Sequence, residues 1–285
     1  MKKILLKSPA KVNLYLKIIN RRPDGFHNLV TIFERINLFD SIELKAIKEN
    51  KIRIYCDHKD VPTGPKNLVY KVAQKLKDDF RLSQGVEIRI VKRIQVAAGM
   101  AGGSSNAATV ILGLNRLWNL KLSQAKMVAY ASKIGSDVAF FLYDTSWALG
   151  TQRGEKIRPL KSSQKLWHVL VIPRIKLYAK DVYGRLKLQL TKKSDDANIL
   201  LQHLKKNRLD AVSALMTNDL ESTVMEIHPQ LKWLKMRMEQ LKCFKVLVSG
   251  SGPCVYGLVS SRTEALRIRK ILNQKYSRVF VAQTF

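Results

Sequence analysis

Apolar and polar residues alternate most regularly near the start of the chain. In KVNLYLKI every second residue from Val12 to Ile18 is apolar, which is the period of a β-strand with one buried face. The residues between them belong to the opposite face, so Lys11 and Asn13 are expected as neighbours on an accessible surface. Tyr15 fits an ordinary exposed strand face.

A tight turn is predicted directly after this strand, in RRPDGFHNL. Pro23 presets one turn dihedral, Asp24 can bond to nearby backbone, and Gly25 can take a positive φ. Such a turn is expected to direct Phe26 and His27 outward.

The rest of the pattern alternates between strands and helices. Strands are predicted in VTIFERINLFDSIEL, VEIRIV and HVLVIP, and helices at 68–76, 105–118 and 123–134 and between 179 and 242. Ser123 is the expected N-cap of its helix, and Gly135 the expected left-handed stop. KVLVSGSGPCVYGLV predicts a strand, a glycine-rich loop and a strand.

A charged, apolar-poor stretch at 150–165 is predicted to be a crossing between domains or a hairpin leading to one. We place the domain boundary near Glu155. The pattern therefore predicts an α/β (α+β) protein with domains at residues 1–155 and 156–285.

Composition agrees with a globular protein. The 285 residues are 46% apolar, enough for proper cores, and no apolar run approaches the roughly 18 to 20 residues that span a bilayer. The start, MKKILLKSPAK, is too short in apolar residues for a secretion signal. Three distant cysteines lack the spacing of a zinc or redox motif, so we expect a cytoplasmic protein without membrane contact.

Charge is the unusual property. Lys and Arg number 51 against 22 Asp and Glu, a net charge of +29 that attracts phosphates, nucleic acids or anionic lipid. The basic residues are dispersed, without an arginine-rich tail or a recognisable nucleic-acid module. A solvated basic surface is favoured, and a basic nucleic-acid-binding protein is the less favoured alternative.

The stretch AAGMAGGSSNAA carries almost no side-chain bulk. Gly99, Gly102 and Gly103 allow conformations and close approaches that a Cβ would obstruct, and Ser104 and Ser105 stand where a helix N-cap belongs. Free N–H groups and the dipole at a helix start favour an anion. Neither the Walker nor the Rossmann pattern is present. Taken alone, the stretch fits a phosphate loop or a tight helix-packing site equally well.

Three segments together remove this ambiguity. SPAKVN, AAGMAGGSSNAA and SGSGPCVYGL occur in the order and at the intervals of the GHMP small-molecule kinases, which the chain resembles. Within that superfamily, SPAKVNLYLKI, RRPDGFHNL, GSDVAFFL and GTQRGE are similar to the 4-diphosphocytidyl-2-C-methyl-D-erythritol kinases of the non-mevalonate isoprenoid pathway. Another GHMP kinase, for homoserine, mevalonate or a sugar, is the nearer alternative, and PDGFH speaks against it.

The resemblance implies the GHMP kinase fold. An N-terminal ATP-binding domain and a C-terminal substrate domain would hold the active-site cleft between them, and the last strand, near Val279, can return to the first domain. The expected reaction is ATP-dependent phosphorylation of the 2-hydroxyl of CDP-methylerythritol with Mg²⁺. We expect these small molecules as partners, no nucleic acid, and a monomer or homodimer.

The resemblance also implies site residues. Lys11 and Asp137 correspond to the catalytic pair, and such a pair suits phosphoryl transfer, which needs positioning and charge stabilisation. The nucleotide site maps to Gln95, Val96, Ala97, Ala98, Gly99, Met100, Ala101, Gly102, Gly103, Ser104, Ser105, Asn67, Leu68 and Lys92. The substrate site maps to Asn13, Phe26, His27 and Tyr183.

Four positions depart from the family pattern. Gln95 and Ala139 each replace a proline, Trp147 replaces a small residue or threonine, and Ala179 stands where a hydroxyl residue is common. None removes a group that phosphoryl transfer needs, so we expect them to affect affinity more than activity.

Overall fold

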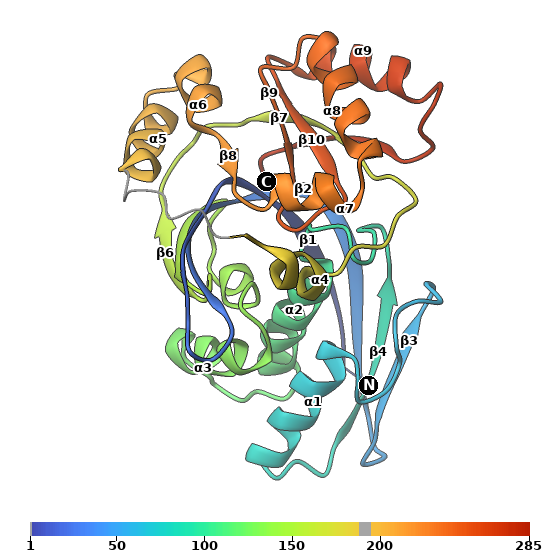
Figure 1. Ribbon diagram of the computed structural model, residues 1–285. Helices are drawn as coiled ribbons and strands as arrows, with labels where there is room; N and C mark the ends of the chain where they lie inside the picture. Colours follow the sequence, from blue (N-terminus) through green and yellow to red (C-terminus); the bar gives the residue numbers. More distant parts are fainter. Residues whose placement is uncertain (1, 188–194) are drawn as a thin grey trace. The chain divides into compact units, whose positions relative to one another are not determined.

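The computed structural model describes residues 2–187 and 195–285 in two compact units (Figure 1). The first unit comprises Met1–Ala10, Leu38–Val96 and Ala101–Asp144, and the second comprises Lys11–Asn37, Ala97–Met100 and Thr145–Phe285. These units interleave along the chain. The domain boundary near Glu155 stays a prediction.

Two long strands, β1 (Lys3–Arg21) and β2 (His27–Ile47), contribute residues to both units. The other elements of the first unit are β3 (Ile52–Cys56), α1 (Leu68–Asp79), β4 (Gly85–Val91), α2 (Gly102–Leu117), α3 (Gln124–Ile134) and the 3-10 helix η1 (Ala139–Leu142). In this unit β4 pairs antiparallel with β2 and parallel with β3.

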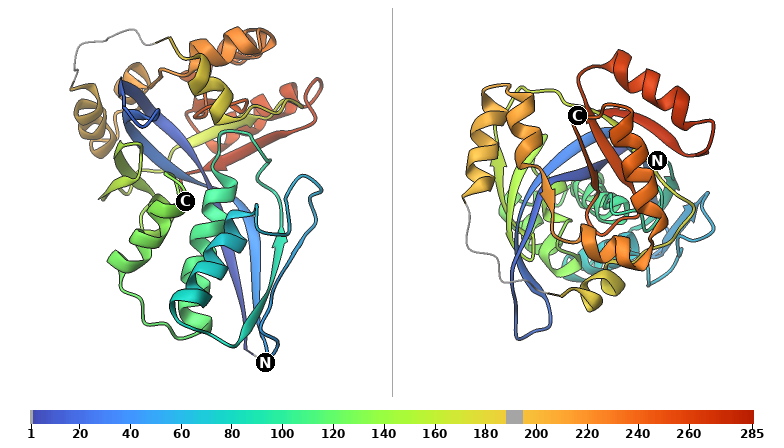
Figure 2. Two further views of the ribbon diagram at one scale, coloured as in Figure 1. Left: turned by 60° about the horizontal axis from the view of Figure 1, so that its bottom comes forward. Right: turned by 45° about the horizontal axis from the view of Figure 1, so that its top comes forward.

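Helix α2 packs closely on the strands of the first unit. A Cβ atom placed on Gly113 would lie 2.2 Å from Leu44 Cδ1 of β2 and 2.8 Å from Leu6 Cδ1 of β1. The missing side chain therefore lets the helix approach the sheet. Figure 2 shows α1 beside α2, and α3 also contacts both helices. The result is an apolar core under α2.

The second unit contains a sheet in the order β11-β7-β10-β9. Its elements after β2 are β5 (Trp147–Gln152), β6 (Lys156–Leu160), β7 (Trp167–Val171), α4 (Ala179–Arg185), α5 (Asp196–Lys205), α6 (Leu209–Leu215), β8 (Thr217–Asn218), α7 (Glu221–Ile227), α8 (Gln230–Gln240), β9 (Lys245–Val248), β10 (Val255–Val259), α9 (Arg262–Leu272) and β11 (Val279–Gln283). The charged stretch at 150–165 forms the hairpin of β5 and β6, and β5 pairs with β2. Of the two predictions for that stretch, the hairpin is confirmed.

The two faces of this sheet differ in chemistry. Val169 and Val171 of β7 join one apolar cluster with Leu234 of α8 and Ile268 of α9. Alternate residues belong to the opposite face, where Tyr256 of β10 donates from its hydroxyl to the main-chain oxygen of Asn13, at 2.7 Å. This hydrogen bond joins β10 to the backbone of β1 at Asn13.

The burial of β1 around Asn13 corrects one prediction. Lys11 is 3% exposed and Asn13 1% exposed, so the strand face that carries them is buried rather than accessible. Tyr15 is buried as well. The alternating pattern correctly predicted the strand, but β1 has neighbours on both faces.

Two helix ends show the limits of local signals. Ser123 is the N-cap of α3, as predicted, and its hydroxyl accepts from the Lys126 N–H at 3.4 Å. The prediction of a left-handed stop at Gly135 is wrong, because its φ is 176° and the backbone there is extended.

Within residues 2–187 and 195–285, no helix has both the length and the apolar character to cross a bilayer.

Candidate active site

The glycine-rich loop leads into α2 through left-handed backbone. Ala97, Gly99 and Ala101 have φ values of 53°, 76° and 54°. Ala101 is the N-cap of α2, and Ser105 is the residue whose N–H donates to the Ala101 carbonyl, at 2.9 Å. The N–H groups of the residues from Gly102 to Ser104 have no helix carbonyl to bond, and such free N–H groups at a helix start bind anions.

The prediction that Ser104 and Ser105 cap this helix is wrong. The helix begins at Gly102, so both serines lie in its first turn. Ser105 is fully buried, and its hydroxyl shares a 2.8 Å hydrogen bond with Ser8 of β1. That hydroxyl anchors the helix within the first unit.

The three glycines of this segment have different surroundings. A Cβ on Gly99 would lie 2.0 Å from the Ser249 carbonyl oxygen, and one on Gly102 would lie 2.9 Å from Ile94 Cγ2. A Cβ on Gly103 meets no atom within 4 Å. Open space therefore remains at Gly103, beside the first N–H groups of α2.

A buried carboxylate fixes the approach to the loop. Asp40 accepts from the N–H groups of Arg93 and Ile94, at 2.7 and 2.9 Å, and from Asn106 Nδ2 at 2.9 Å. It also forms an ion pair with Lys92. Asp40 and Asn106 were not among the predicted site residues, although an aspartate inside the apolar strand of NLFDSIEL is a visible signal.

Two of the residues predicted for the nucleotide site outside the glycine-rich loop are engaged within the protein. Lys92 has its side chain 4% exposed in the pair with Asp40. Asn67 is the N-cap of α1: its Oδ1 accepts from the Val69 N–H at 2.9 Å, and its Nδ2 donates to the Pro62 carbonyl at 2.6 Å. Leu68 is half-buried at the start of the helix. Their contact with a nucleotide stays a prediction.

Lys11 and Asn13 come together in the second unit. Lys11 Nζ donates to Asn13 Oδ1 at 2.6 Å, and Asn13 Nδ2 donates to the hydroxyl of Thr31 at 2.7 Å. The Lys11 ammonium also lies 5.5 Å from the centre of the Phe33 ring. The ammonium is therefore held by named groups on two strands.

The loop of SGSGPC lies against the same groups. Gly250 has a φ of 52°, and a Cβ placed on it would lie 3.3 Å from both Lys11 Nζ and Asn13 Oδ1. The Cys254 N–H donates to the Ala98 carbonyl at 3.3 Å. Burial raises the pKa of the Cys254 thiol, which fits packing rather than chemistry. This loop supports the glycine-rich segment from within the second unit.

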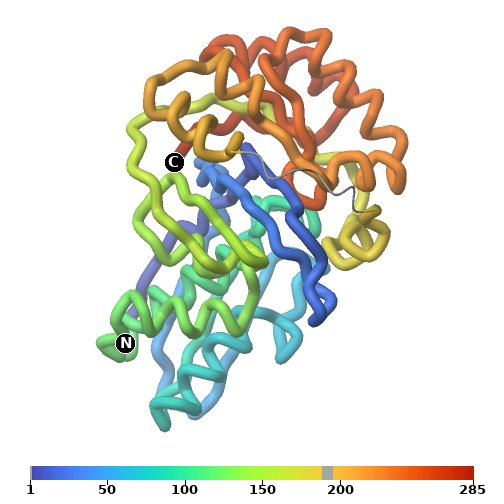
Figure 3. Tube along the Cα trace, turned by 60° about the vertical axis from the view of Figure 1, so that its left-hand side comes forward, coloured from blue at the N-terminus to red at the C-terminus, as the bar shows by residue number. Residues whose placement is uncertain are grey.

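The predicted turn places an aromatic cluster. Gly25 has a φ of 82° and the Phe26 N–H donates to Asp24 Oδ1 at 3.1 Å, as expected. Figure 3 shows β1 and β2, both in blue, as neighbouring traces joined by this turn. Phe26 points outward, 53% exposed, with the guanidinium of Arg153 5.0 Å from the centre of its ring.

His27 differs from the prediction because it is buried, at 8% exposed. Its ring stacks on that of Tyr183 of α4, with centroids 5.3 Å apart and planes 29° from parallel. Burial, and secondarily the charge of Arg21, lowers the pKa of His27. The structure therefore brings two predicted substrate residues into direct contact.

Asp137 lies in the turn between α3 and η1 and is half-buried. It belongs to the first unit and Lys11 to the second, so their cooperation stays a prediction. Of the departures from the family pattern, Ala139 begins η1, Ala179 begins α4, and Trp147 is fully buried in β5.

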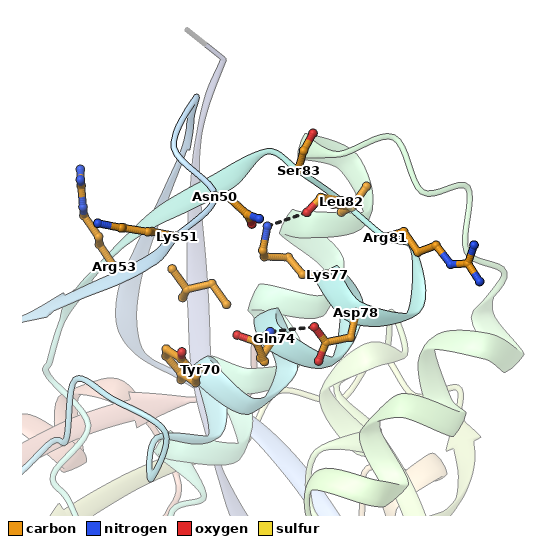
Figure 4. Close-up of a pocket in the computed structure, with 11 residues that line it drawn as sticks. Asn50, Lys51, Arg53, Tyr70, Gln74, Lys77, Asp78, Arg81, Leu82 and Ser83 are labelled. Carbon is orange, nitrogen blue, oxygen red and sulfur yellow. Dashed lines mark hydrogen bonds between the residues drawn. The ribbon is translucent and has the colours of Figure 1, made fainter.

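A cavity of about 810 Å³ lies elsewhere in the first unit (Figure 4). Its lining comes from the start of β3 and the residues before it and from α1 and the residues after it, and it contains none of the predicted site residues. Lys77 at its centre donates to the carbonyl oxygens of Leu82 and Gln84, at 2.7 and 2.9 Å. Arg53 at its edge pairs with Glu49. The bonds of Lys77 hold the connection from α1 to β4.

Known proteins identify the family. Residues 67–145 match the GHMP kinases N terminal domain, and residues 200–278 match the GHMP kinases C terminal family. A protein of Bacillus velezensis is 42% identical over 93% of this chain and 91% of its own length, and one of Geobacillus kaustophilus is 38% identical over 99% and 97%. Both are named 4-diphosphocytidyl-2-C-methyl-D-erythritol kinase. The chain belongs to this family.

Solved structures agree with the 4-diphosphocytidyl-2-C-methyl-D-erythritol kinase family. A crystal structure of 4-(cytidine 5'-diphospho)-2C-methyl-D-erythritol kinase has a TM-score of 0.84 at 29% identity and covers 98% of both chains. A homoserine kinase of Cytophaga hutchinsonii, 18% identical with a TM-score of 0.80, shares the fold. The predicted GHMP kinase fold is therefore confirmed.

Proposed function

We propose that this protein transfers the γ-phosphoryl group of ATP to the 2-hydroxyl of 4-(cytidine 5'-diphospho)-2-C-methyl-D-erythritol. The observation that carries the proposal is the open space at Gly103 beside the unpaired N–H groups of α2. It occurs in a chain whose relatives are named for this kinase activity. The reaction belongs to the non-mevalonate isoprenoid pathway in the cytoplasm.

The triphosphate binds along the loop from Gln95 to Ser105. Backbone N–H groups and the dipole of α2 stabilise its charge, and the absence of a side chain at Gly103 leaves room for it. Mg²⁺ would neutralise the phosphates, and their oxygens and water supply most of its ligands. Asp40 keeps the approach to this loop rigid through its bonds to Arg93 and Ile94.

Asp137 and Lys11 act on the transfer itself. The Asp137 carboxylate orients the acceptor hydroxyl and takes its proton, while the Lys11 ammonium stabilises negative charge on the transferring group. Phosphoryl transfer depends on such positioning more than on covalent help. Asn13 holds the ammonium through the 2.6 Å hydrogen bond from Lys11 Nζ.

The pyrimidine of the substrate binds at the aromatic cluster. Phe26 presents an exposed ring face for stacking, and His27, stacked on Tyr183, can offer directional hydrogen bonds to a base edge. A homoserine, mevalonate or sugar kinase has no need for such a cluster. This difference favours a nucleotide-bearing acceptor.

A turnover assay tests the proposal. Purified protein with CDP-methylerythritol and ATP should release ADP, and homoserine, mevalonate and a hexose should give background rates. CMP should inhibit competitively with the acceptor. No turnover with CDP-methylerythritol refutes the proposal, and tight, salt-dependent oligonucleotide binding without ATP turnover would favour a nucleic-acid-binding protein instead.

A further inference from the structure

We propose that Thr31 is a positioning residue, whose hydroxyl sets the orientation of the Asn13 amide and through it the place of the Lys11 ammonium. The inference deepens the proposed function, because it rests on Lys11 acting at the transferring phosphoryl group. Thr31 acts through Asn13 and Lys11.

The direction of each hydrogen bond follows from donor chemistry. The Thr31 hydroxyl lies 2.7 Å from the carbonyl oxygen of Tyr15. Because a carbonyl oxygen can only accept, the hydroxyl donates its single proton to it. Its oxygen must then accept from Asn13, at 2.7 Å, and the amide group that faces it must be the NH₂. The Asn13 oxygen is left facing Lys11 Nζ, at 2.6 Å.

The opposite amide orientation is excluded by the same groups. A rotated amide would direct its NH₂ at an ammonium, which has donors only, and its oxygen at a hydroxyl whose proton is already committed. Lys11, Asn13 and Thr31 are 3%, 1% and 1% exposed, so bulk water would not compensate either loss. The chain of bonds therefore has one consistent direction, set at Thr31.

The backbone around Asn13 is fixed independently. Tyr256 donates to the Asn13 main-chain oxygen at 2.7 Å, and the Lys11 N–H donates to the Met100 carbonyl at 3.2 Å. Because these bonds hold the backbone, the Thr31 hydroxyl determines only the orientation of the Asn13 side-chain amide. The methyl group of Thr31 has a separate role, since it packs beside Gly150, where an added Cβ would approach it to 3.0 Å.

The two parts of the Thr31 side chain can be separated by substitution. Thr31→Val keeps the shape and removes the hydroxyl, and Thr31→Ser keeps the hydroxyl and removes the methyl. We expect Thr31→Val to lower kcat by about 10- to 100-fold, because a misplaced ammonium is costly, while KM for ATP changes less than about twofold. Thr31→Ser should rescue kcat to within about threefold of the parent.

A packing role predicts the reverse order. If the methyl contact were what matters, Thr31→Ser would be the worse variant and Thr31→Val close to the parent. Thr31→Ala, which differs from Thr31→Ser by the hydroxyl alone, repeats the comparison should the valine variant unfold. Parent-like kcat in a hydroxyl-free variant, or loss of kcat in folded Thr31→Ser, overturns the inference.

A second measurement does not need turnover. In the ligand-free protein, NMR of the Asn13 side-chain amide should show protected NH₂ protons in the parent and in Thr31→Ser, and lose protection in Thr31→Val. Equal protection in all three proteins contradicts the role of Thr31. If the parent has no kinase activity but the three proteins show the expected order of NH₂ protection, the proposed function is refuted and the role of Thr31 in orienting the Asn13 amide stands.

Discussion

Asp40 and Lys92 form a buried ion pair immediately before the segment that enters the glycine-rich loop. The same carboxylate binds the N–H groups of Arg93 and Ile94, so one side chain holds three consecutive residues. Removing one partner of a buried pair is costly because the other charge stays buried without compensation.

Asp40→Ala should therefore destabilise the protein by about 3 to 5 kcal/mol and weaken ATP binding. Glu43 offers a matched control on the same strand, because its pair with Lys3 is at the surface and is worth at most about 1 kcal/mol. Denaturant unfolding with and without ATP measures both effects. An Asp40→Ala protein as stable as Glu43→Ala would show that the pair does not hold this segment.

The glycines of the loop should respond differently to alanine. At Gly99 the new Cβ would lie 2.0 Å from the Ser249 oxygen with φ at 76°, so Gly99→Ala should lower stability by at least about 1 to 3 kcal/mol. At Gly103 the fold has room, so Gly103→Ala should keep its stability and lose about tenfold in ATP affinity, and Gly103→Val more.

Gly184 of α4 provides the control for this pair. An added Cβ there also meets no atom within 4 Å, so Gly184→Ala should change neither stability nor ATP affinity appreciably. Chemical unfolding and calorimetric ATP titration distinguish the four variants. Normal ATP affinity in Gly103→Val would remove the triphosphate from this loop.

Features with local causes could be predicted from the sequence. The period of Val12 to Ile18 specified β1, and the turn chemistry of Asp24 and Gly25 specified the reversal before β2. Each depends on residues within a few positions of one another. The Ser123 cap of α3 was predictable for the same reason.

Features with distant causes could not be predicted. The pattern showed that Lys11 and Asn13 share a strand face, but the loop that lies against their side chains is at Gly250, far away in the sequence. Alternation says which residues share a face and not what lies over it. The aspartate of NLFDSIEL is visible in the sequence, but its partners could not be assigned because they stand 52 and 53 residues later.

The predicted start of α2 was wrong for a third reason. Serines suit N-caps, but Ala101 takes the cap position in a left-handed conformation, so the helix begins before Ser104. Left-handed alanine is uncommon and has no sequence signature of its own. Strain of this kind is often found at functional sites, which agrees with a loop shaped for a ligand.

Asp137→Ala should reduce kcat by about 10²- to 10⁴-fold while ATP affinity changes little, because its proposed work is confined to the acceptor hydroxyl. Steady-state kinetics and ATP titration on one preparation check this. Asp144, which also lies near the end of the first unit, supplies an acidic control that should retain kcat. A fully active Asp137→Ala would remove that carboxylate from the chemistry.

Phe26→Ala should act on binding instead. The ring is exposed and contributes a stacking face, so its loss should raise KM for the acceptor about tenfold and leave kcat within about threefold. Phe26→Tyr keeps the face and should behave like the parent. An unchanged KM in the alanine variant would place the pyrimidine elsewhere.

The pH dependence of pyrimidine binding should follow His27. Burial and Arg21 lower the pKa of the imidazole, so in the folded protein it stays neutral below the ordinary value of about 6.5. The unfolded chain takes up the proton first, so His27 should reduce stability as the pH falls below about 6.5.

If the neutral ring on Tyr183 binds the base, CMP affinity should be level from pH 8 to about 6.5 and fall only on further acidification. CMP should also lower the pKa of His27 further, because a ligand that binds the neutral form opposes protonation. Titrating the His27 ring protons by NMR with and without CMP measures this directly, and His27→Asn should lack the acid-side loss. A His27 pKa that CMP raises would mean that the charged ring binds the ligand.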